Sequence, residues 1–321
     1  MSGGGRESAP VAVFAYARPE HLRATLAALA SNELAARLRV VIFSDGARSE
    51  ADRAAVASVR DVAREFAASG AFGRAEIRER EQNAGLADSI VGGVTELVRD
   101  EGRAIVVEDD LVTSPHFLEF MNDALDRYEG EDRVMHIAGH MFDIEPEGLP
   151  GAFFLRHSSC WGWATWARAW RHLDRDAAGH LGRMSSADAH RFDVDGHLDY
   201  ARQLRANAEG SLRTWAVLWY ASVFRCGGLC LHPRESLVRN IGFDGSGEHC
   251  GEIESVGDRL GRAAIDPAEF PGEFEEHGLA MLRYKEAVAA ATGAGGTRVR
   301  LGRIPGLVRS AVASVMRGVG R

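Results

Sequence analysis

Lysine and long apolar runs are nearly absent from this chain of 321 residues. Lys285 is its single lysine and follows no glycine-rich turn. This excludes a Walker-type ATPase, because the phosphate-binding loop of those proteins requires a lysine at the end of such a turn. No segment approaches the roughly 18 consecutive apolar residues of a membrane-spanning helix, and the polar N-terminus lacks the apolar region of a secretory signal. We therefore expect a cytoplasmic protein that does not span a membrane.

Cysteine is also scarce, and the charge balance is acidic. The four cysteines are too few and too irregularly spaced for a disulfide framework, and the C-x3-C spacing of Cys226 and Cys230 lacks the rest of a zinc-finger pattern. The net charge is −8, and residues 297–321 carry arginines without any acid, so the preceding chain is more acidic still. This balance excludes nucleic acid as the principal partner, because phosphate contacts require clustered Lys and Arg.

Short apolar runs alternate with helical patterns over the first half of the chain. The expected strands are 11–15, 39–43, 76–79, 105–107 and 133–138. Apolar residues at three- and four-residue spacing predict helices between them, as in Leu22, Leu26 and Leu29 after Pro19. This alternation predicts an α/β fold with a Rossmann-like, mostly parallel sheet flanked by helices. The carboxyl ends of the strands would then meet at one edge, where such sheets bind ligands.

Three consecutive acids follow one of these strands. Glu108, Asp109 and Asp110 come directly after the apolar run 105–107. Burying them within the strand would cost several kcal/mol per ion, so they belong at its exit, facing a cation or a polar ligand. Carboxylate oxygens suit Mg²⁺ or Mn²⁺. The alternative is a solvated acidic turn.

Beyond about residue 150 the regular alternation ends and the tryptophans begin. All six fall within residues 161–219. Trp163, Trp166 and Trp170 share one helical face, and Trp215 shares another with the tryptophan four residues on, which is typical of core packing. Some of them could instead line a platform for a sugar or an acceptor.

A glycine-rich loop and a basic helix complete the chain. Residues 242–251 contain four glycines, which permit rearrangement, so we expect this loop to be mobile when empty and to close over a ligand. Residues 304–319 place an apolar stripe on one helical face with arginines off it. Such a helix predicts a peripheral anchor on the inner face of the membrane, although a docked or disordered terminus is the alternative.

Four segments together resemble bacterial glycosyltransferases of the GT-A fold, which are distantly similar to N-acetylglucosaminyltransferase I. They are VAVFAYARP at the first strand, FSDG after the second, VVEDDLVTSPHFLEF around the acids, and SCWGWATWARAW among the tryptophans. The resemblance, together with the end of the strand–helix alternation near residue 150 and the start of the basic segment, divides the chain into four parts. These are a disordered tail at 1–10, a nucleotide-sugar-binding half at 11–150, an acceptor-side half at 151–296 and the basic amphipathic segment at 297–321.

The resemblance implies a role for each matched residue. Arg18 would contact the nucleotide, and Asp45 would contact its uracil or ribose. Glu108 and Asp109 would hold ribose and donor sugar, while Asp110 would coordinate Mn²⁺ or Mg²⁺. The implied partners are a nucleotide-sugar donor, expected to be a UDP-sugar, and a glycan or lipid-linked acceptor. A divalent ion would stabilise the departing nucleoside diphosphate without a lysine.

The acceptor side departs from the family pattern. Trp163 and Trp215 would lie beside the acceptor. In inverting relatives an aspartate directly after a tryptophan deprotonates the acceptor hydroxyl, but here Ala216 follows Trp215. The alternative bases are Glu209, Asp244 and Glu248, each of which would need to come within hydrogen-bond reach of the acceptor. His249 could be a second metal ligand or a structural histidine.

The main hypothesis is a metal-dependent, inverting glycosyltransferase that uses a nucleotide sugar in cell-surface glycan assembly. One alternative is a catalytically inactive nucleotide-sugar- or glycan-binding protein of the same fold, because the expected base is missing. A metal-dependent phosphohydrolase is a weaker alternative. That chemistry needs an aspartate at the first acid, where Glu108 stands, and a catalytic lysine.

Overall fold

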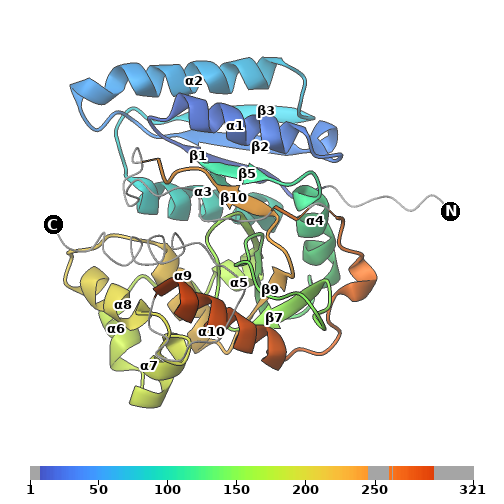
Figure 1. Cartoon of the computed structure of the whole chain (residues 1–321). Helices are drawn as coiled ribbons and strands as arrows, with labels where there is room; N and C mark the ends of the chain where they lie inside the picture. The colour runs from blue at the N-terminus through green and yellow to red at the C-terminus, as the bar shows by residue number, and fades with distance from the viewer. Residues whose placement is uncertain (1–7, 245–259, 262, 293–321) are drawn as a thin grey trace.

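The computed structural model describes residues 8–244, 260–261 and 263–292. They form a mixed α/β structure in which helices flank a large, mostly parallel central sheet (Figure 1), which confirms the predicted fold class. Within these ranges no helix is long and apolar enough to cross a bilayer. Most of the predicted glycine-rich loop, from Gly245 onward, and the basic segment 297–321 lie outside the described residues.

The strands of the described residues form two sheets. They are β1 (Val11–Ala15), β2 (Arg39–Ser44), β3 (Arg74–Glu79), β4 (Arg103–Glu108), β5 (Leu111–Thr113), β6 (Val134–Ala138), β7 (Ala152–Leu155), β8 (Trp163–Trp166), β9 (Leu229–Pro233) and β10 (Val238–Asn240). Eight form the central sheet in the order β3-β2-β1-β4-β8-β6-β9-β7, while β5 pairs antiparallel with β10 in a small ribbon. β8 lies antiparallel between β4 and β6, so the two predicted halves share one continuous sheet.

Helices cover both faces of this sheet. They are α1 (Pro19–Ala30), α2 (Arg53–Ala68), α3 (Leu86–Glu101), α4 (Phe117–Arg127), α5 (Ala167–Trp170), α6 (Ala177–Gly182), α7 (Ser186–Phe192), α8 (Tyr200–Ala208), α9 (Ala216–Arg225) and α10 (Gly278–Thr292). Short 3₁₀ turns occur at Ala35–Arg37, Glu50–Asp52 and Pro267–Glu269. α1, α2 and α4 pack on one face, and α3, α5 and α9 pack on the other (Figure 1).

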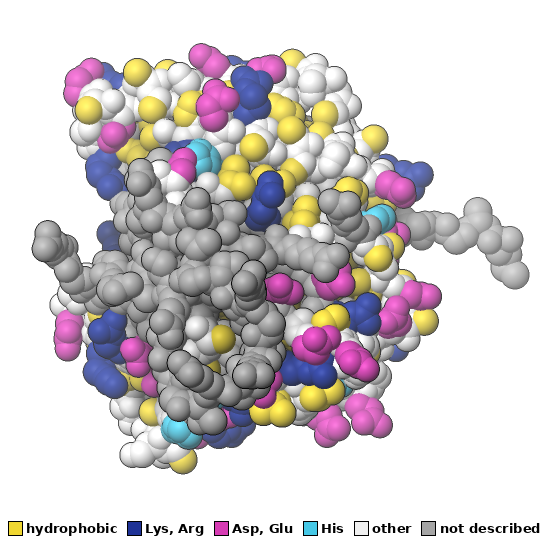
Figure 2. Space-filling view, in the orientation of Figure 1, with side chains coloured by type: hydrophobic (Ala, Val, Ile, Leu, Met, Phe, Trp, Pro, Cys, Tyr) yellow, Lys and Arg dark blue, Asp and Glu magenta, His cyan; other side chains and the backbone are white. Residues whose placement is uncertain are grey.

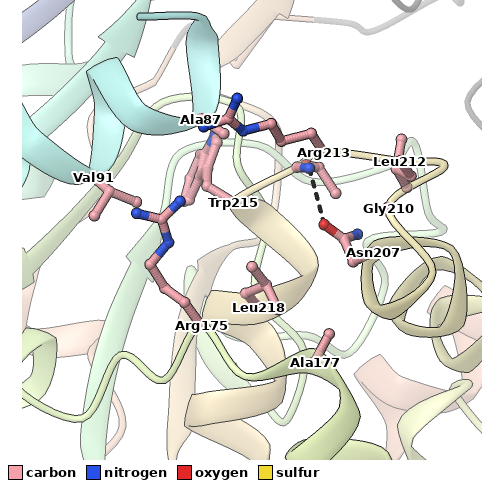
Figure 3. Close-up of a pocket in the computed structure, with 11 residues that line it drawn as sticks. Ala87, Val91, Arg175, Ala177, Asn207, Gly210, Leu212, Arg213, Trp215 and Leu218 are labelled. Carbon is pink, nitrogen blue, oxygen red and sulfur yellow. Dashed lines mark hydrogen bonds between the residues drawn. The ribbon is translucent and has the colours of Figure 1, made fainter.

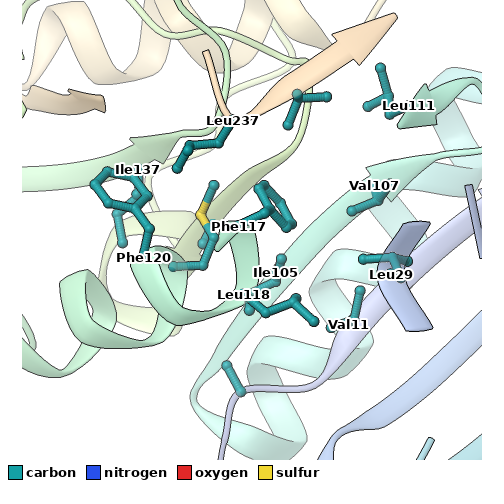
Figure 4. Close-up of a cluster of buried hydrophobic side chains, with 14 of the residues drawn as sticks. Val11, Leu29, Ile105, Val107, Leu111, Phe117, Leu118, Phe120, Ile137 and Leu237 are labelled. Atoms are coloured by element: carbon teal, nitrogen blue, oxygen red, sulfur yellow. The ribbon is translucent and has the colours of Figure 1, made fainter. Parts of the chain in front are cut away.

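Alternation along the strands builds the two cores. Val11 and Val13 of β1 belong to the cluster under α1, α2 and α4, whereas Ala12 and Phe14 face α3. Figure 4 shows the first cluster, in which strand residues such as Ile105 lie against α1 and α4. Burying each side chain of this size contributes roughly 1.5–3 kcal/mol. Both faces of the strands are therefore covered, as their unbroken apolar runs predict.

Local sequence signals fix where α1 begins and where α3 ends. Pro19 occupies the first turn of α1, where its missing N–H costs nothing. Gly102 ends α3 with φ of 79°, a left-handed conformation that favours glycine, and its N–H donates to Val98 O (2.9 Å). The chain enters β4 at the next residue. β4 then runs parallel to β1, with Phe14 opposite Glu108, so the acids come to the same edge as Arg18.

The structure corrects the predicted helical spacing of the tryptophans. Residues 163–166 form β8 and not part of a helix. Trp163 packs with α3 and α9, whereas Trp166 packs on the opposite face of the sheet. Pairing with β4 on one side and β6 on the other imposes the two-residue period of a strand on this segment. The helix begins only at Ala167.

The structure also differs from the predicted tail at residues 1–10. Ala9 and Pro10 are buried, and the Ala9 N–H donates to Asn122 Oδ1 (2.8 Å). Pro10 O accepts the Ile105 N–H (2.9 Å), which extends the pairing of β1 with β4. These two residues therefore belong to the folded body, and residues 1–7 lie outside the described residues.

Candidate functional site

The carboxyl ends of β1 and β4 lie side by side and carry the acids. Phe14 is opposite Glu108 in the parallel register, so the residues that follow each strand meet at one edge of the sheet. The Tyr16 N–H donates to Asp109 Oδ2 (3.1 Å). The turn after the first strand and the acids after the fourth therefore form one local site.

Arg18 bridges the two aspartates from the residue before α1. Its Nη2 contacts Asp109 Oδ1 and lies 2.9 Å from Asp110 Oδ2. The exposed fractions of the Arg18, Asp109 and Asp110 side chains are 20%, 5% and 13%, so water screens these contacts only weakly. The Thr25 hydroxyl donates to Asp109 O (2.7 Å), which fixes the acidic turn against α1.

Negative charge is crowded at this edge. Burial, with repulsion from Asp110 and Asp109, raises the pKa of Glu108 to about 8. Burial also raises the pKa of Asp109 to about 6, although Arg18 opposes this shift. Burial acts to lower the pKa of Arg18, but the Asp109 and Asp110 carboxylates outweigh it and hold that pKa above its ordinary value. The two aspartates share one guanidinium, so a further cation would stabilise them when both are charged.

Two carboxylates at this edge offer oxygens of the kind that a hard divalent cation binds. Asp109 and Asp110 offer carboxylate oxygens, and a guanidinium already lies against both. In the part of the chain that the structure describes, no group of three His, Cys, Asp or Glu is arranged to hold a metal. A cation here would therefore need further oxygens from a ligand, as Mg²⁺ does when one or two carboxylates and substrate phosphates bind it. His249, the predicted second ligand, lies outside the described residues.

The β5–β10 ribbon brings Gly242 against the acids. The Ile241 N–H donates to Asp110 O (2.8 Å). A Cβ on Gly242 would collide with Asp110 Oδ2 and would lie 2.9 Å from Arg18 Nη1. Only glycine permits this close approach. Sequence pattern misses this contact, because the glycine and the acid lie in distant segments that only the ribbon joins.

Asp45 lies after β2, but its carboxylate is engaged by the protein. It accepts the N–H groups of Gly46 (2.9 Å), Ala84 (3.0 Å) and Gly85 (2.9 Å). It also accepts the Ser89 hydroxyl (3.2 Å). These bonds hold the turn that begins α3. The contact of Asp45 with a nucleotide stays a prediction, and its observed role is to position this turn.

The three predicted bases lie in different places. Asp244 is at the acidic edge, because its Oδ2 lies 3.2 Å from Nε2 of His21, which follows Arg18 in the first turn of α1. Glu209 is exposed at the end of α8. Glu248 lies outside the described residues. Of the two described candidates, only Asp244 is held beside the element that carries Arg18.

A cavity of about 290 Å³ lies beside the start of α3 (Figure 3). Its walls come from α3, the segment before α6, and the segment from the end of α8 to α9. Arg175, Arg213 and Trp215 line it, and both arginines pair with Asp88 of α3. Trp215 is an acceptor-side residue of the sequence prediction, whereas the three charged residues are not. Arg175 and Arg213 lie in loops without a periodic pattern, and Asp88 is a single polar residue in the first turn of the helix α3.

Trp163 does not reach this cavity or the solvent, which corrects its predicted place beside the acceptor. It is completely buried, and its ring stacks on Trp215 at 5.0 Å between centroids. Its other neighbours include Trp170 (5.7 Å) and the ring of His136 (5.4 Å). Trp163 therefore supports Trp215 from beneath, while Trp215 is the residue that lines the cavity.

Comparison with known proteins gives only distant likeness. No protein-family model matches this chain, and no curated protein matches its sequence. TarS from S. aureus, in two crystal structures, is 14% and 13% identical over 41% of this chain, with a TM-score of 0.30 in each case. The match spans only 21% and 34% of those TarS chains.

The galactosyltransferase LgtC, in complex with donor and acceptor sugar analogues, matches more of the chain. It is 12% identical over 69% of this chain and 72% of its own, with a TM-score of 0.36. These values are too low to carry an argument about activity.

Proposed function

We propose that this protein is a glycosyltransferase of the GT-A fold that moves a sugar from a nucleotide-sugar donor to a glycan or lipid-linked acceptor with Mn²⁺ or Mg²⁺. The observation that carries the proposal is the pair Asp109–Asp110 at the exit of β4, bridged by Arg18 from the exit of β1. Ligands bind at the carboxyl ends of strands in such sheets. The segment resemblance to bacterial relatives of N-acetylglucosaminyltransferase I agrees with this assignment.

The chemistry requires positive charge beside the departing phosphates. A nucleoside diphosphate gains negative charge as the glycosidic bond breaks. Asp110, with Asp109 beside it, would hold the divalent ion, which when bound stabilises that charge as a Lewis acid. Arg18 adds a fixed guanidinium that can donate to phosphate oxygens in a chain with one lysine. Glu108, partly buried at the same edge, is placed to hold hydroxyls of the ribose or donor sugar.

Transfer also needs a group that removes the acceptor proton. We propose Asp244 for this role over Glu209, because Asp244 lies against His21 at the acidic edge. An inverting outcome is part of the proposal, since one base and direct attack suffice for it. An inactive donor-binding protein is the second candidate, and the observation that favours it is Ala216 at the family's position for the base.

The cellular setting is likewise a proposal. We infer a cytoplasmic enzyme, with residues 304–319 as a basic amphipathic anchor on the inner face of the membrane. An acceptor linked to a membrane lipid would then be presented to the enzyme at the surface where it binds.

Thermal unfolding with UDP and UDP-sugars, with and without MnCl₂, tests the donor site, because a ligand that binds only the folded state raises its Tm. We expect UDP with Mn²⁺ to raise the Tm more than either alone. Release of free UDP from a UDP-sugar would then separate an enzyme from an inactive binding protein. Absence of any nucleotide- or metal-dependent shift would contradict the proposed function.

A further inference from the structure

The cavity beside α3 carries an excess of positive charge within an acidic protein. Asp88 pairs with Arg175 through Oδ1 (Nη2, 2.6 Å) and with Arg213 through Oδ2. One carboxylate therefore faces two guanidinium groups. Each contact engages one Nη2, whereas a guanidinium carries five N–H donors. The trio is thus suited to accept a second anion beside Asp88.

Structural support does not explain these arginines. The exposed fractions of the Arg175 and Arg213 side chains are 50% and 72%. Ion pairs with this exposure contribute little to stability, because solvent screens them and ordering long side chains costs entropy. Figure 3 shows the two side chains reaching toward α3 from different segments of the cavity wall. They can move toward a ligand without disturbing a buried network.

The remaining walls of the cavity suit a sugar ring. Trp215 and Leu218 are 4% and 7% exposed, so each offers one edge to the cavity, and Val91 adds apolar surface. Asn207 and Thr214 add polar groups. A pyranose presents the same combination of C–H faces and hydroxyl edges. Contacts within the protein hold parts of this wall in place: the Thr214 N–H donates to Asn207 Oδ1 (3.1 Å), and Trp215 stacks on the buried Trp163. A cavity of about 290 Å³ has room for one sugar-sized group.

The cavity also adjoins the edge of the sheet. Ala87 and Asp88 lie in the first turn of α3, directly after the turn whose N–H groups bind Asp45 at the end of β2. A ligand in the cavity would therefore lie on the side of the sheet where β2 ends, which is the edge that also carries the ends of β1 and β4. The cavity itself is built by the chain's second half and α3.

We propose that this cavity binds an acidic sugar of the acceptor, with Arg175 and Arg213 contacting its carboxylate or phosphate. That the sugar belongs to an acceptor rests on the proposed function, whereas binding of an anionic sugar does not. The two arginines offer the forked donors that carboxylates and phosphates accept. Trp215 would contact the sugar ring. In the empty cavity Asp88 pairs with both arginines, and the anionic group of the ligand would replace Asp88 as their partner.

The test is titration of the full chain with glucuronate, glucose 6-phosphate and uncharged glucose, followed by NMR of the tryptophan indole N–H groups. We expect either or both anionic probes to bind at least about tenfold more tightly than glucose. Arg175→Ala and Arg213→Ala should each weaken the anionic probe by about tenfold or more. Asp88→Asn should strengthen it, because the internal competitor for both guanidinium groups loses its charge.

Arg225→Ala is the matched control. Arg225 also shares one carboxylate with a second arginine, since it lies 3.0 Å from Asp174 while Arg183 lies 2.9 Å from the same residue. It does not line the cavity, so this variant should bind the probes as the wild type does. Equal affinity for glucose and both anions, or equal losses in the control and cavity variants, would overturn the site.

Binding of UDP with Mn²⁺ to the same variants separates this inference from the proposed function. Unchanged UDP affinity in Arg175→Ala and Arg213→Ala, with weaker binding of the anionic sugar, supports an acceptor site distinct from the donor site. A parallel loss of UDP affinity would overturn the acceptor assignment and place the arginines at the donor. If UDP fails to bind the wild type while the anionic sugar binds, the proposed function fails and the cavity stands as a sugar-acid site.

Discussion

Arg18 Nη2 lies 2.9 Å from Asp110 Oδ2 and also contacts Asp109, so one cation at the exit of β1 holds two acids at the exit of β4. Each residue comes from a turn that the parallel pairing of these strands brings together. In the protein without ligand, this contact offsets the repulsion between the two carboxylates. It also gives the site a cation already positioned for phosphate.

Removing that cation should destabilise the empty protein. Arg18→Ala leaves two shielded carboxylates without their partner, so we expect the free energy of unfolding to fall by about 3 kcal/mol in urea titrations at pH 7. Added MnCl₂ should restore part of this loss if the acids bind metal. Arg23→Ala is the control, because its pair with Glu65 is exposed and screened by solvent, so its loss should change the free energy of unfolding much less. Equal losses in the two variants would refute the role given to Arg18.

Gly242→Ala should disturb the acidic edge from the β5–β10 ribbon. The added Cβ would push against Asp110 Oδ2 and Arg18 Nη1, so we expect the affinity for UDP with Mn²⁺ to fall by about tenfold. Gly272→Ala is the control, because no atom lies near the Cβ that it would add. Isothermal calorimetry measures both variants. An unchanged affinity in Gly242→Ala would show that the ribbon does not constrain the acids.

The strand ends could be predicted from sequence, whereas the cavity could not. Glu108 to Asp110 directly follow a buried apolar strand, and the cost of burying charge places them at its exit. Asp88, Arg175 and Arg213 come from three separate segments, and no spacing relates them. They meet because the segments before α6 and before α9 both reach the start of α3, which is a tertiary contact.

The tryptophans show that residue spacing alone does not always distinguish a helix from a strand. The spacing of Trp163, Trp166 and Trp170 fits a helix as well as it fits a strand followed by a helical turn. Pairing partners decide between these structures, and β4 and β6 are supplied by other parts of the chain. The burial of Trp163 beneath Trp215 follows from that pairing.

Acidification should destabilise the protein through its buried histidines. Burial, with repulsion from His232, lowers the pKa of His136 to about 3, and the Trp219 indole N–H donates to its Nδ1 (3.1 Å), which requires a neutral ring. Burial lowers the pKa of His232 to about 4. Between pH 6.5 and about 4 the unfolded chain therefore binds more protons than the folded one. The free energy of unfolding should fall by up to about 1.4 kcal/mol per pH unit for each histidine.

Substitutions separate the pH dependence that the histidines cause from the pH dependence that Glu108 causes. The raised pKa of Glu108 acts in the opposite direction, because its contribution is present below pH 4.5 and is lost as the pH rises through about 8. His136→Gln should reduce the loss of stability between pH 7 and pH 5, measured in urea. His172→Gln, at an exposed position, should leave it unchanged. The same loss in wild type and His136→Gln would contradict the prediction.

Deleting residues 304–321 should release the protein from anionic vesicles. The deleted segment supplies the arginines and the apolar stripe that would bind such a surface. Transfer to a soluble acceptor should be retained, because the proposed site residues lie before this segment. Co-sedimentation with vesicles measures the difference, and equal binding by the truncated protein would rule out the anchor.

The most direct measurement of the central claim is calorimetric titration of UDP into the wild type and Asp110→Ala, each with and without Mn²⁺. In the wild type we expect Mn²⁺ to strengthen UDP binding by at least about tenfold. In Asp110→Ala the affinity should be the same with and without the metal, while Asp61→Asn, an exposed change on α2, should behave as the wild type. A metal-dependent gain that survives in Asp110→Ala would contradict the assignment of this edge as the metal and donor site.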